Sequence, residues 1–274
     1  MDDNQHHQDG TKNVHAGTNH VGESVNTPIF LSSTYKLTEE RYAGWAAGAQ
    51  HTLLYSRISS VNSDAVAQKI CAMEGGEDAE TFASGMAAIS STLMMLLSQG
   101  DHMVASPDVY GGTYGLITEE LPRFGIEVTM ADMTEPSSYE AAIQPNTKIL
   151  YIETITNPNL KVCDIPAMVE IGKRHNLLVI IDNTFASPWA CKPLSMGVDL
   201  VIHSTTKFLG GHSDLIGGAV VGSKELITKI FKGRVHFGGS PDPHNCYLLE
   251  RGMRTLHARM PLLTSNASTL AERL

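Results

Sequence analysis

Short apolar runs alternate with amphipathic segments along most of the chain after about residue 69. The apolar runs have the length of strands and predict strands over 80–83, 102–106, 127–131, 149–153, 178–181, 199–203 and 218–222. The segments between them predict helices, for example over 87–97, 114–124 and 165–175. Near-continuous apolar strands separated by helices are typical of a mostly parallel sheet covered on both faces. We therefore predict an α/β fold of this kind.

The two ends of the chain depart from this pattern. Residues 1–13 are polar and lack the apolar run of a signal peptide, and the residues up to 68 show no sustained periodicity. We expect a flexible arm and an irregular wrapping segment over 1–68, followed by an α/β domain over 69–258. Residues 259–274 predict a helix that ends without a Gly or Pro, and we expect it to connect to a further domain in the natural protein.

Composition narrows the class of ligand. The chain has 274 residues, of which 42% are hydrophobic, so a large core can form. The net charge of −9 is spread along the chain, and no basic patch indicates nucleic acid or an anionic membrane. No apolar run is long enough to cross a bilayer. A small diffusible ligand is therefore expected.

The cysteines and histidines do not predict a metal site. Cys71, Cys163, Cys191 and Cys246 lie far apart without C-x-x-C spacing, which indicates reduced thiols in a cytoplasmic protein. The histidines show no H-E-x-x-H or comparable spacing, so we interpret them as structural.

A lysine follows the apolar run 198–203 closely. Lys207 lies in the sequence Ser204-Thr205-Thr206-Lys207, and a lysine at the rim of an apolar sheet is expected to be partly desolvated. Desolvation favours the neutral amine, which is the form that makes a Schiff base. Two hydroxyl groups next to it could hold a phosphate, and pyridoxal phosphate (PLP) needs both functions. The alternative is a surface lysine in a polar loop.

Other strand ends carry groups that suit the same cofactor. Asp182 ends a buried run and would pair with a protonated pyridine nitrogen, although an aspartate there could also be a helix N-cap. Gly85 and Met86 begin a predicted helix, whose N-terminal amides bind anions; with Ser204 and Thr206 they would form a phosphate cup.

Three further positions have weaker support from the residues alone. Tyr110 could stack on a planar ring and move a proton at the leaving group, or it could be a core tyrosine. Asn157 could hydrogen-bond the ring hydroxyl oxygen, or Asn-Pro could simply form a turn. Arg57, in Tyr55-Ser56-Arg57, offers a fork for phosphate or is an ordinary surface arginine.

Taken in order, these residues resemble the Cys/Met-metabolism family of PLP-dependent enzymes, of fold type I. The resemblance extends from Thr27 to the final helix. Its densest matches are Tyr55-Ser56-Arg57, Glu74-Gly75-Gly76-Glu77, Ser84-Gly85-Met86-Ala87-Ala88, Tyr110-Gly111-Gly112-Thr113, Asp182-Asn183-Thr184 and Ser204-Thr205-Thr206-Lys207. The resemblance implies the large PLP-binding domain of this fold, with the smaller C-terminal domain absent.

The resemblance also implies roles for these residues. Lys207 would bind PLP as a Schiff base, Asp182 would pair with the pyridinium, and Tyr110 would stack on the ring. Phosphate contacts would come from Gly85, Met86, Ser204 and Thr206. Tyr55 and Arg57 would reach the phosphate of a neighbouring subunit, which implies a homodimer or homotetramer with shared sites.

The implied activity is γ-elimination or γ-replacement on sulfur or homoserine-derived amino acids, as in cystathionine γ-synthase and γ-lyase. Three departures from the family keep other assignments open. Gly115 stands where cystathionine-handling members often have an arginine, Gly112 replaces the cysteine typical of methionine γ-lyases, and Ser60-Val61-Asn62 replaces Asn-Pro-Thr. Methionine γ-lyase, O-acylhomoserine sulfhydrylase, a PLP aminotransferase and a catalytically inactive remnant of the fold are the alternatives.

Overall fold

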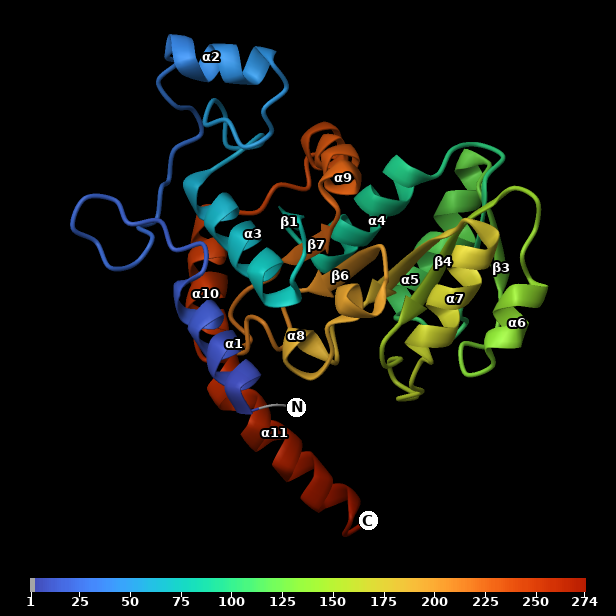
Figure 1. The fold of residues 1–274 in the computed structure, drawn as a ribbon. Coiled ribbons are helices and arrows are strands. Elements are labelled where there is room, and N and C mark those ends of the chain that lie inside the picture. The colour runs from blue at the N-terminus through green and yellow to red at the C-terminus, as the bar shows by residue number, and fades with distance from the viewer. Residues whose placement is uncertain (1–2) are drawn as a thin grey trace.

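A seven-stranded sheet organises the computed structural model, which describes residues 3–274 (Figure 1). The strands are β1 (Asp78–Phe82), β2 (His102–Ala105), β3 (Glu127–Met130), β4 (Thr147–Glu153), β5 (Leu178–Asp182), β6 (Leu200–Ser204) and β7 (Gly218–Gly222). Each lies within two residues of a predicted strand. The apolar runs therefore located the sheet correctly.

The sheet is mostly parallel, as predicted, with one reversed strand. The strand order is β1-β7-β6-β5-β4-β2-β3, and β7 runs antiparallel to both of its neighbours. A parallel pair needs a crossover connection, usually a helix. Residues 205–217 between β6 and β7 contain turns and no helix, so the chain folds back and β7 is reversed. The ends of β4, β5 and β6 and the loop 205–217 thus share one edge of the sheet.

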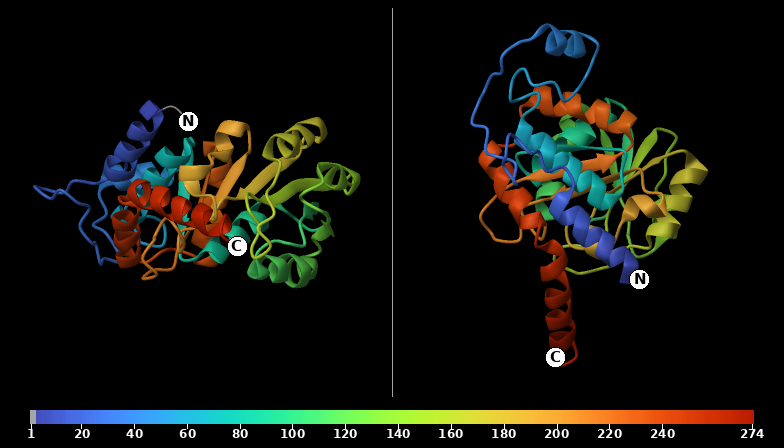
Figure 2. Two further views of the ribbon diagram at one scale, coloured as in Figure 1. Left: turned by 90° about the horizontal axis from the view of Figure 1, so that it is seen from below. Right: turned by 60° about the vertical axis from the view of Figure 1, so that its left-hand side comes forward.

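Helices cover both faces of the sheet (Figure 2). The longer ones are α3 (Val61–Glu74), α4 (Gly85–Leu96), α7 (Ile165–His175), α9 (Lys224–Phe237), α10 (Pro243–Met253) and α11 (Leu256–Ala271). Short ones are α5 (Gly111–Gly115), α6 (Pro136–Ala141) and α8 (Ser187–Ala190). The predicted helix over 114–124 is present as α5, a π-helical turn over Leu116–Glu120 and a 3₁₀ turn over Leu121–Phe124.

Alternation along the central strands divides the core between the two faces. In β4, Ile149 and Tyr151 pack on the side of α4 and α9, whereas Leu150 and Ile152 pack on the side of α7. Successive side chains of a strand point to opposite faces, so an apolar run without polar gaps requires cover on both sides. A third apolar cluster joins α3 and α10 to β1 and β7.

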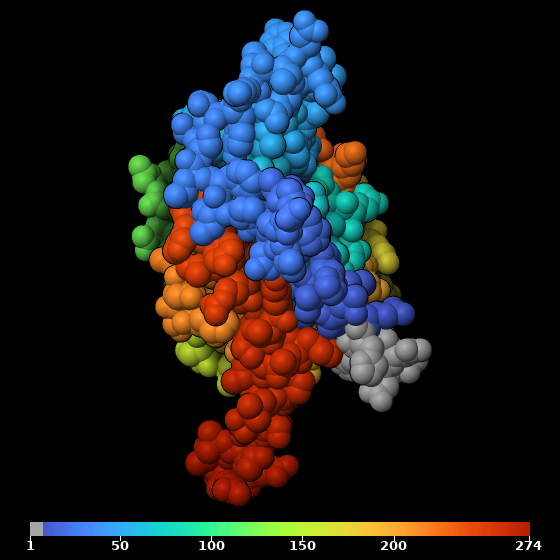
Figure 3. Space-filling model, turned by 90° about the vertical axis from the view of Figure 1, so that its left-hand side faces the viewer, coloured from blue at the N-terminus to red at the C-terminus, as the bar shows by residue number. Residues whose placement is uncertain are grey.

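The N-terminal region contains more helix than we expected. Besides the start of α3, it forms α1 (Asp3–His15) and α2 (Glu39–Ala46). The part of this region that we expected to be a flexible polar arm is mostly helix α1, which lies against α3 and α11 (Figure 3). The physical reason is Lys69, whose fully buried Nζ donates to the carbonyl oxygens of Asn13 (3.2 Å) and Val14 (3.1 Å). Hydrogen bonds from a lysine side chain satisfy the last carbonyl oxygens of a helix and so stabilise that end.

The other end of the chain is helical, as predicted. Helix α11 begins at Leu256, and its side chains from Pro261 onward are exposed (Figure 1). Among residues 3–274, no helix is both long and apolar enough to span a membrane.

The anchoring of α1 predicts a specific pH dependence of stability. Burial lowers the pKa of Lys69 to about 8, from 10.5 for an exposed lysine. Between these values the unfolded chain binds more protons than the folded one, so the Lys69 contribution to the free energy of unfolding rises with pH. The free-energy difference between the wild type and Lys69→Met should rise by at most ~1.4 kcal/mol per pH unit.

Urea unfolding of both proteins at about pH 7.5 and about pH 9.5 measures this difference. Lys232→Met, at an exposed position in α9, is the matched control and should show no such trend. A difference between wild type and Lys69→Met that stays constant over the interval would contradict the assignment.

Candidate active site

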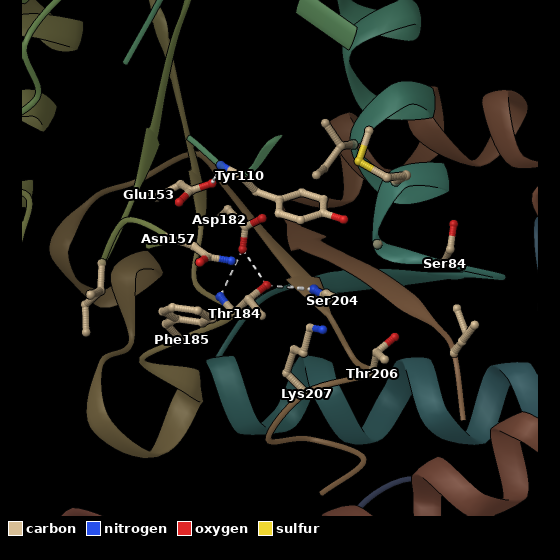
Figure 4. A pocket seen from close by; sticks show the side chains of 15 residues that line it. Ser84, Tyr110, Glu153, Asn157, Asp182, Thr184, Phe185, Ser204, Thr206 and Lys207 are labelled. Carbon is tan, nitrogen blue, oxygen red and sulfur yellow. Dashed lines mark hydrogen bonds between the residues drawn. The ribbon is translucent and has the colours of Figure 1, made fainter. Parts of the chain in front are cut away.

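A cavity of about 250 Å³ opens at the ends of β4, β5 and β6, beside the first turn of α4 (Figure 4). All the predicted site residues except Tyr55 and Arg57 line it: Gly85, Met86, Tyr110, Asn157, Asp182, Ser204, Thr206 and Lys207. These residues come from five separate chain segments. The topology brings them together because the carboxyl ends of parallel strands meet at one edge.

Lys207 lies three residues beyond β6, in the turn that begins the reversing loop. Its backbone is held at both sides, because its N–H donates to Ser204 O (3.3 Å) and its carbonyl accepts from Gly211 N (2.7 Å). The side-chain amine points into the cavity, opposite the ring of Tyr110 (Figure 4). The Lys207 side chain is exposed in this chain. It therefore offers an amine that is open to a ligand.

The first turn of α4 forms one end of the cavity. The Ser84 hydroxyl oxygen caps the helix by accepting from Ala87 N (3.0 Å), and the cavity is lined by the next two residues, Gly85 and Met86. A Cβ atom on Gly85 would lie 2.8 Å from Ser204 Cβ, so only glycine allows the helix to approach β6 this closely. Thr206 lies at the same end, where its hydroxyl accepts from Gly217 N (3.1 Å). A helix N-terminus beside hydroxyl groups is suited to an anion such as phosphate.

Two carboxyl groups lie side by side at the opposite end. Asp182 ends β5, and its partner in the adjacent strand β4 is Glu153. Both are buried, with 8% and 3% of their surface exposed. Asp182 Oδ1 accepts from the backbone N–H of Thr184 (2.9 Å) and from its hydroxyl, whereas Glu153 Oε1 accepts from Tyr110 N (2.8 Å).

Burial sets the charge of this pair. Burial, and after it the negative charge of Asp182, raises the pKa of Glu153 to about 8. Burial also raises the pKa of Asp182, but the hydrogen bonds from Thr184 and the nearby His203 work against that rise. We therefore assign the proton of the pair to Glu153 and the negative charge to Asp182. A charged Asp182 is complementary to a protonated ring nitrogen.

Tyr110 and Asn157 lie on loops that follow β2 and β4. The Tyr110 ring extends across the cavity, and the tyrosine is 47% exposed, so it is not a core residue (Figure 4). A Cβ atom on Gly112 would lie 2.6 Å from Tyr110 Cε1, so the glycine at this position leaves room for the ring. Asn157 lines the cavity near Asp182.

Tyr55 and Arg57 do not line the cavity of their own chain. Both are exposed, and the Arg57 guanidinium lies 5.4 Å from the centroid of the Tyr55 ring and donates to Val235 O (2.6 Å). Their segment is anchored by Arg234, which is fully buried, pairs with Glu80 at 2.9 Å and donates to Ile58 O. This arrangement leaves both side chains available to another molecule.

The departure at Ser60-Val61-Asn62 has a structural role. Ser60 is the N-cap of α3 and forms a capping box with Ser63. The Asn62 side chain accepts from Phe30 N and donates to Pro28 O, both at 2.9 Å. These three residues therefore fix the start of α3 and attach the preceding segment to it.

Seven residues that line the cavity were not predicted as site residues. They are Ser84, Ile89, Glu153, Ile155, Thr184, Phe185 and Ile216. Glu153 had a usable signal, since it is the last residue of a buried apolar run, as Asp182 is. Thr184 was part of a quoted motif without a role, and Phe185 had no signal in the sequence.

Side chains that could bind a metal ion do not cluster among the described residues. No group of three or more His, Cys, Asp or Glu side chains within the described residues is arranged to hold a metal ion. The four cysteines are present as free thiols.

The residues of the cavity fit PLP. The cavity contains the open amine of Lys207, the charged carboxylate of Asp182 and the N-terminus of α4 at Gly85. Figure 4 shows the amine between the carboxylate and the helix N-terminus. Lys207 would hold the aldehyde carbon, Asp182 the ring nitrogen, and the first turn of α4 with Ser204 and Thr206 the phosphate.

Comparison with known proteins agrees with this chemistry. The family model described as Cys/Met metabolism PLP-dependent enzyme matches residues 10–274. Over 268 residues the chain is 40% identical to the L-methionine gamma-lyase of Porphyromonas gingivalis, covering 96% of this chain and 67% of that protein. Over 249 residues it is 44% identical to the cystathionine gamma-lyase of Bacillus subtilis, covering 90% and 64%. The chain thus spans about two thirds of the length of these relatives.

Solved structures show the same fold. The crystal structure of a putative O-acetylhomoserine (thiol)-lyase from Campylobacter jejuni, which contains a pyridoxyl-lysine monophosphate, matches with a TM-score of 0.91 at 30% identity. The match covers 96% of this chain and 74% of that one. The predicted fold class, that of fold type I PLP enzymes, is confirmed. The chain belongs to the Cys/Met-metabolism family of PLP-dependent enzymes.

Proposed function

We propose that this protein catalyses PLP-dependent γ-elimination or γ-replacement on sulfur or homoserine-derived amino acids, in the manner of cystathionine γ-synthase or γ-lyase. The observation that carries the proposal is a single cavity that contains the Lys207 amine, the charged Asp182 and the N-terminus of α4. The activities named for its relatives supply the reaction class. The substrate would be a small amino acid.

Four residues of the cavity have roles around the ring in this proposal. When bound, PLP supplies an electron sink that stabilises negative charge at the substrate α-carbon. Lys207 Nζ holds the cofactor and moves the proton at the α-carbon, and Asp182 keeps the ring nitrogen protonated. Tyr110 covers the ring and donates a proton to the leaving group, while Asn157 orients the ring.

One observation favours a second candidate within the same reaction class. Gly115 supplies neither charge nor bulk, although a Cβ atom there would meet nothing within 4 Å, so the space for a side chain is left open. A substrate with a second carboxylate would find no cation there. This favours methionine γ-lyase activity, or O-acylhomoserine sulfhydrylase activity on an uncharged acyl ester, since these substrates lack that group.

We also propose a homodimer or homotetramer with shared sites. Tyr55 and Arg57 are exposed and lie outside the cavity of their own chain, which supports a contact with the site of a neighbouring subunit. We propose a cytoplasmic location, with no nucleic acid or membrane partner, and the four free thiols support it.

One prediction concerns the attachment of PLP to Lys207. After incubation with PLP and reduction with borohydride, peptide mass spectrometry should locate the pyridoxyl group on Lys207, because this amine points into the cavity. Lys207→Ala should lose the adduct and the visible absorption band, whereas Lys224→Ala, at an exposed position outside the cavity, should keep both. An adduct at another lysine together with full turnover would refute the assignment.

The reaction class is tested by keto acid and thiol release from methionine, homocysteine and cystathionine, and by thiol capture with O-acylhomoserine. We expect turnover of at least one of these substrates. Formation of pyridoxamine phosphate from an amino donor, without thiol release, would indicate an aminotransferase. Cofactor binding without turnover of any substrate would indicate the inactive remnant.

Another prediction concerns the charge of Asp182. Asp182→Asn keeps the shape of the side chain but removes the negative charge that holds the ring proton. We expect kcat to fall by ~100-fold or more. Steady-state kinetics check this result, and Asp132→Asn, at an exposed position, is the control. Wild-type kcat in Asp182→Asn would exclude the proposed role.

A further inference from the structure

Two loops frame the cavity, and one carboxyl group contacts both. Glu153 Oε1 accepts from the backbone N–H of Tyr110 at 2.8 Å. The backbone N–H of Asn157 faces the same carboxyl group closely enough to work against the rise of its pKa. The first loop follows β2 and the second follows β4, and Glu153 lies 43 residues from Tyr110 in the chain.

The position of Glu153 makes it a rigid anchor. It is the last residue of β4, which lies between β2 and β5 in the sheet, and only 3% of its surface is exposed. Its neighbours in the sheet therefore restrict its motion. The two loops are also joined by Asp108, which accepts from Asn159 Nδ2 and pairs with Lys161 Nζ, each at 2.7 Å, but these contacts do not involve the Tyr110 amide.

Fixing the Tyr110 backbone has a consequence for its ring. Tyr110 is the N-cap of α5, and its carbonyl oxygen accepts from Tyr114 N at 2.9 Å. The bond to Glu153 therefore determines where α5 begins and in which direction the Tyr110 ring leaves the backbone. Figure 4 shows Glu153 beside the Tyr110 backbone, with the ring extending away from it across the cavity.

The charge on Glu153 is not needed for this contact. Burial and the adjacent Asp182 raise its pKa to about 8, so the side chain is mostly protonated at neutral pH. A protonated carboxyl group still accepts through its carbonyl oxygen. Glutamine offers the same acceptor at the same reach, whereas aspartate is one methylene shorter.

We propose that Glu153 is a positioning residue that fixes the Tyr110 and Asn157 loops on the two sides of the cofactor ring. The identity of the ring rests on the proposed function. The link between the loops does not, because the contacts involve only groups of this chain. The proposal predicts that the acceptor oxygen and its reach matter, and that the titratable proton does not.

Hydrogen–deuterium exchange of the cofactor-free chain tests the link directly. In the peptide over residues 107–112, Glu153→Ala and Glu153→Asp should exchange ~10-fold faster than the wild type, since each loses the acceptor for the Tyr110 amide, with a smaller rise over 154–157. Glu153→Gln should exchange as the wild type does. Peptides over β5 should be unchanged in all variants, which controls for global unfolding.

Titration with PLP provides the second measurement. The dissociation constant should rise ~10-fold in Glu153→Asp and stay within ~2-fold of the wild type in Glu153→Gln. Unchanged exchange in Glu153→Asp, or exchange in Glu153→Gln as fast as in Glu153→Ala, overturns the proposal. If Glu153→Ala fails to fold, the Gln and Asp pair decides the outcome.

The exchange result is independent of the proposed function. Failure of the wild type to bind PLP would refute the function but leave the exchange pattern as the test of the link. Failure of the exchange pattern with normal PLP binding would refute the link alone.

Discussion

The first turn of α4 approaches the ends of β6 and β7 so closely that no side chain fits between them. A Cβ atom on Gly85 would lie 2.8 Å from Ser204 Cβ, and one on Gly218 would lie 2.2 Å from the carbonyl oxygen of Ser84. This contact places the helix N-terminus, with its partial positive charge, beside the strand end that precedes Lys207. Without this contact, the cavity would lack the helix N-terminus that suits an anion.

The reversed strand β7 is the second part of the same arrangement. Because β6 and β7 are joined by a loop instead of a helix, the loop remains at the edge of the sheet where β4 and β5 end. Ser204 pairs with Gly218 across the two strands, so Lys207 lies in a loop whose two ends are held only one strand apart. The backbone of Lys207 is thus constrained while its side chain is exposed. This arrangement suits the role that is proposed for its amine.

Several buried carboxyl groups lie behind this edge of the sheet. Glu153 and Asp182 end adjacent strands, and one layer deeper Glu74 accepts from Asn183 (3.1 Å) and pairs with His203 (2.6 Å). Burying such groups is costly unless each has a partner, so each carboxylate is tied to specific donors. Asp182 accepts from Thr184, and Glu153 accepts from Tyr110 N. Thr184 and the nearby His203 work to lower the pKa of Asp182, whereas burial and the charge of Asp182 raise that of Glu153, so the two carboxyl groups are assigned different protonation states.

The sequence by itself determined the strands, the α/β class, the family and most residues of the cavity. These follow from local signals, since a buried strand requires an apolar run and the motif residues follow strand ends such as Asp182. The tertiary structure alone decided the helical state of α1, which depends on a lysine 55 residues away from Val14, and the link from Glu153 to Tyr110. It also decided that Lys207 is exposed and that Tyr55 and Arg57 lie outside the cavity. Local periodicity shows which side of a helix or strand is apolar. The helical state of α1, the Glu153 contact and the exposure of Lys207 depend instead on which distant segments meet, and packing across the whole fold determines that.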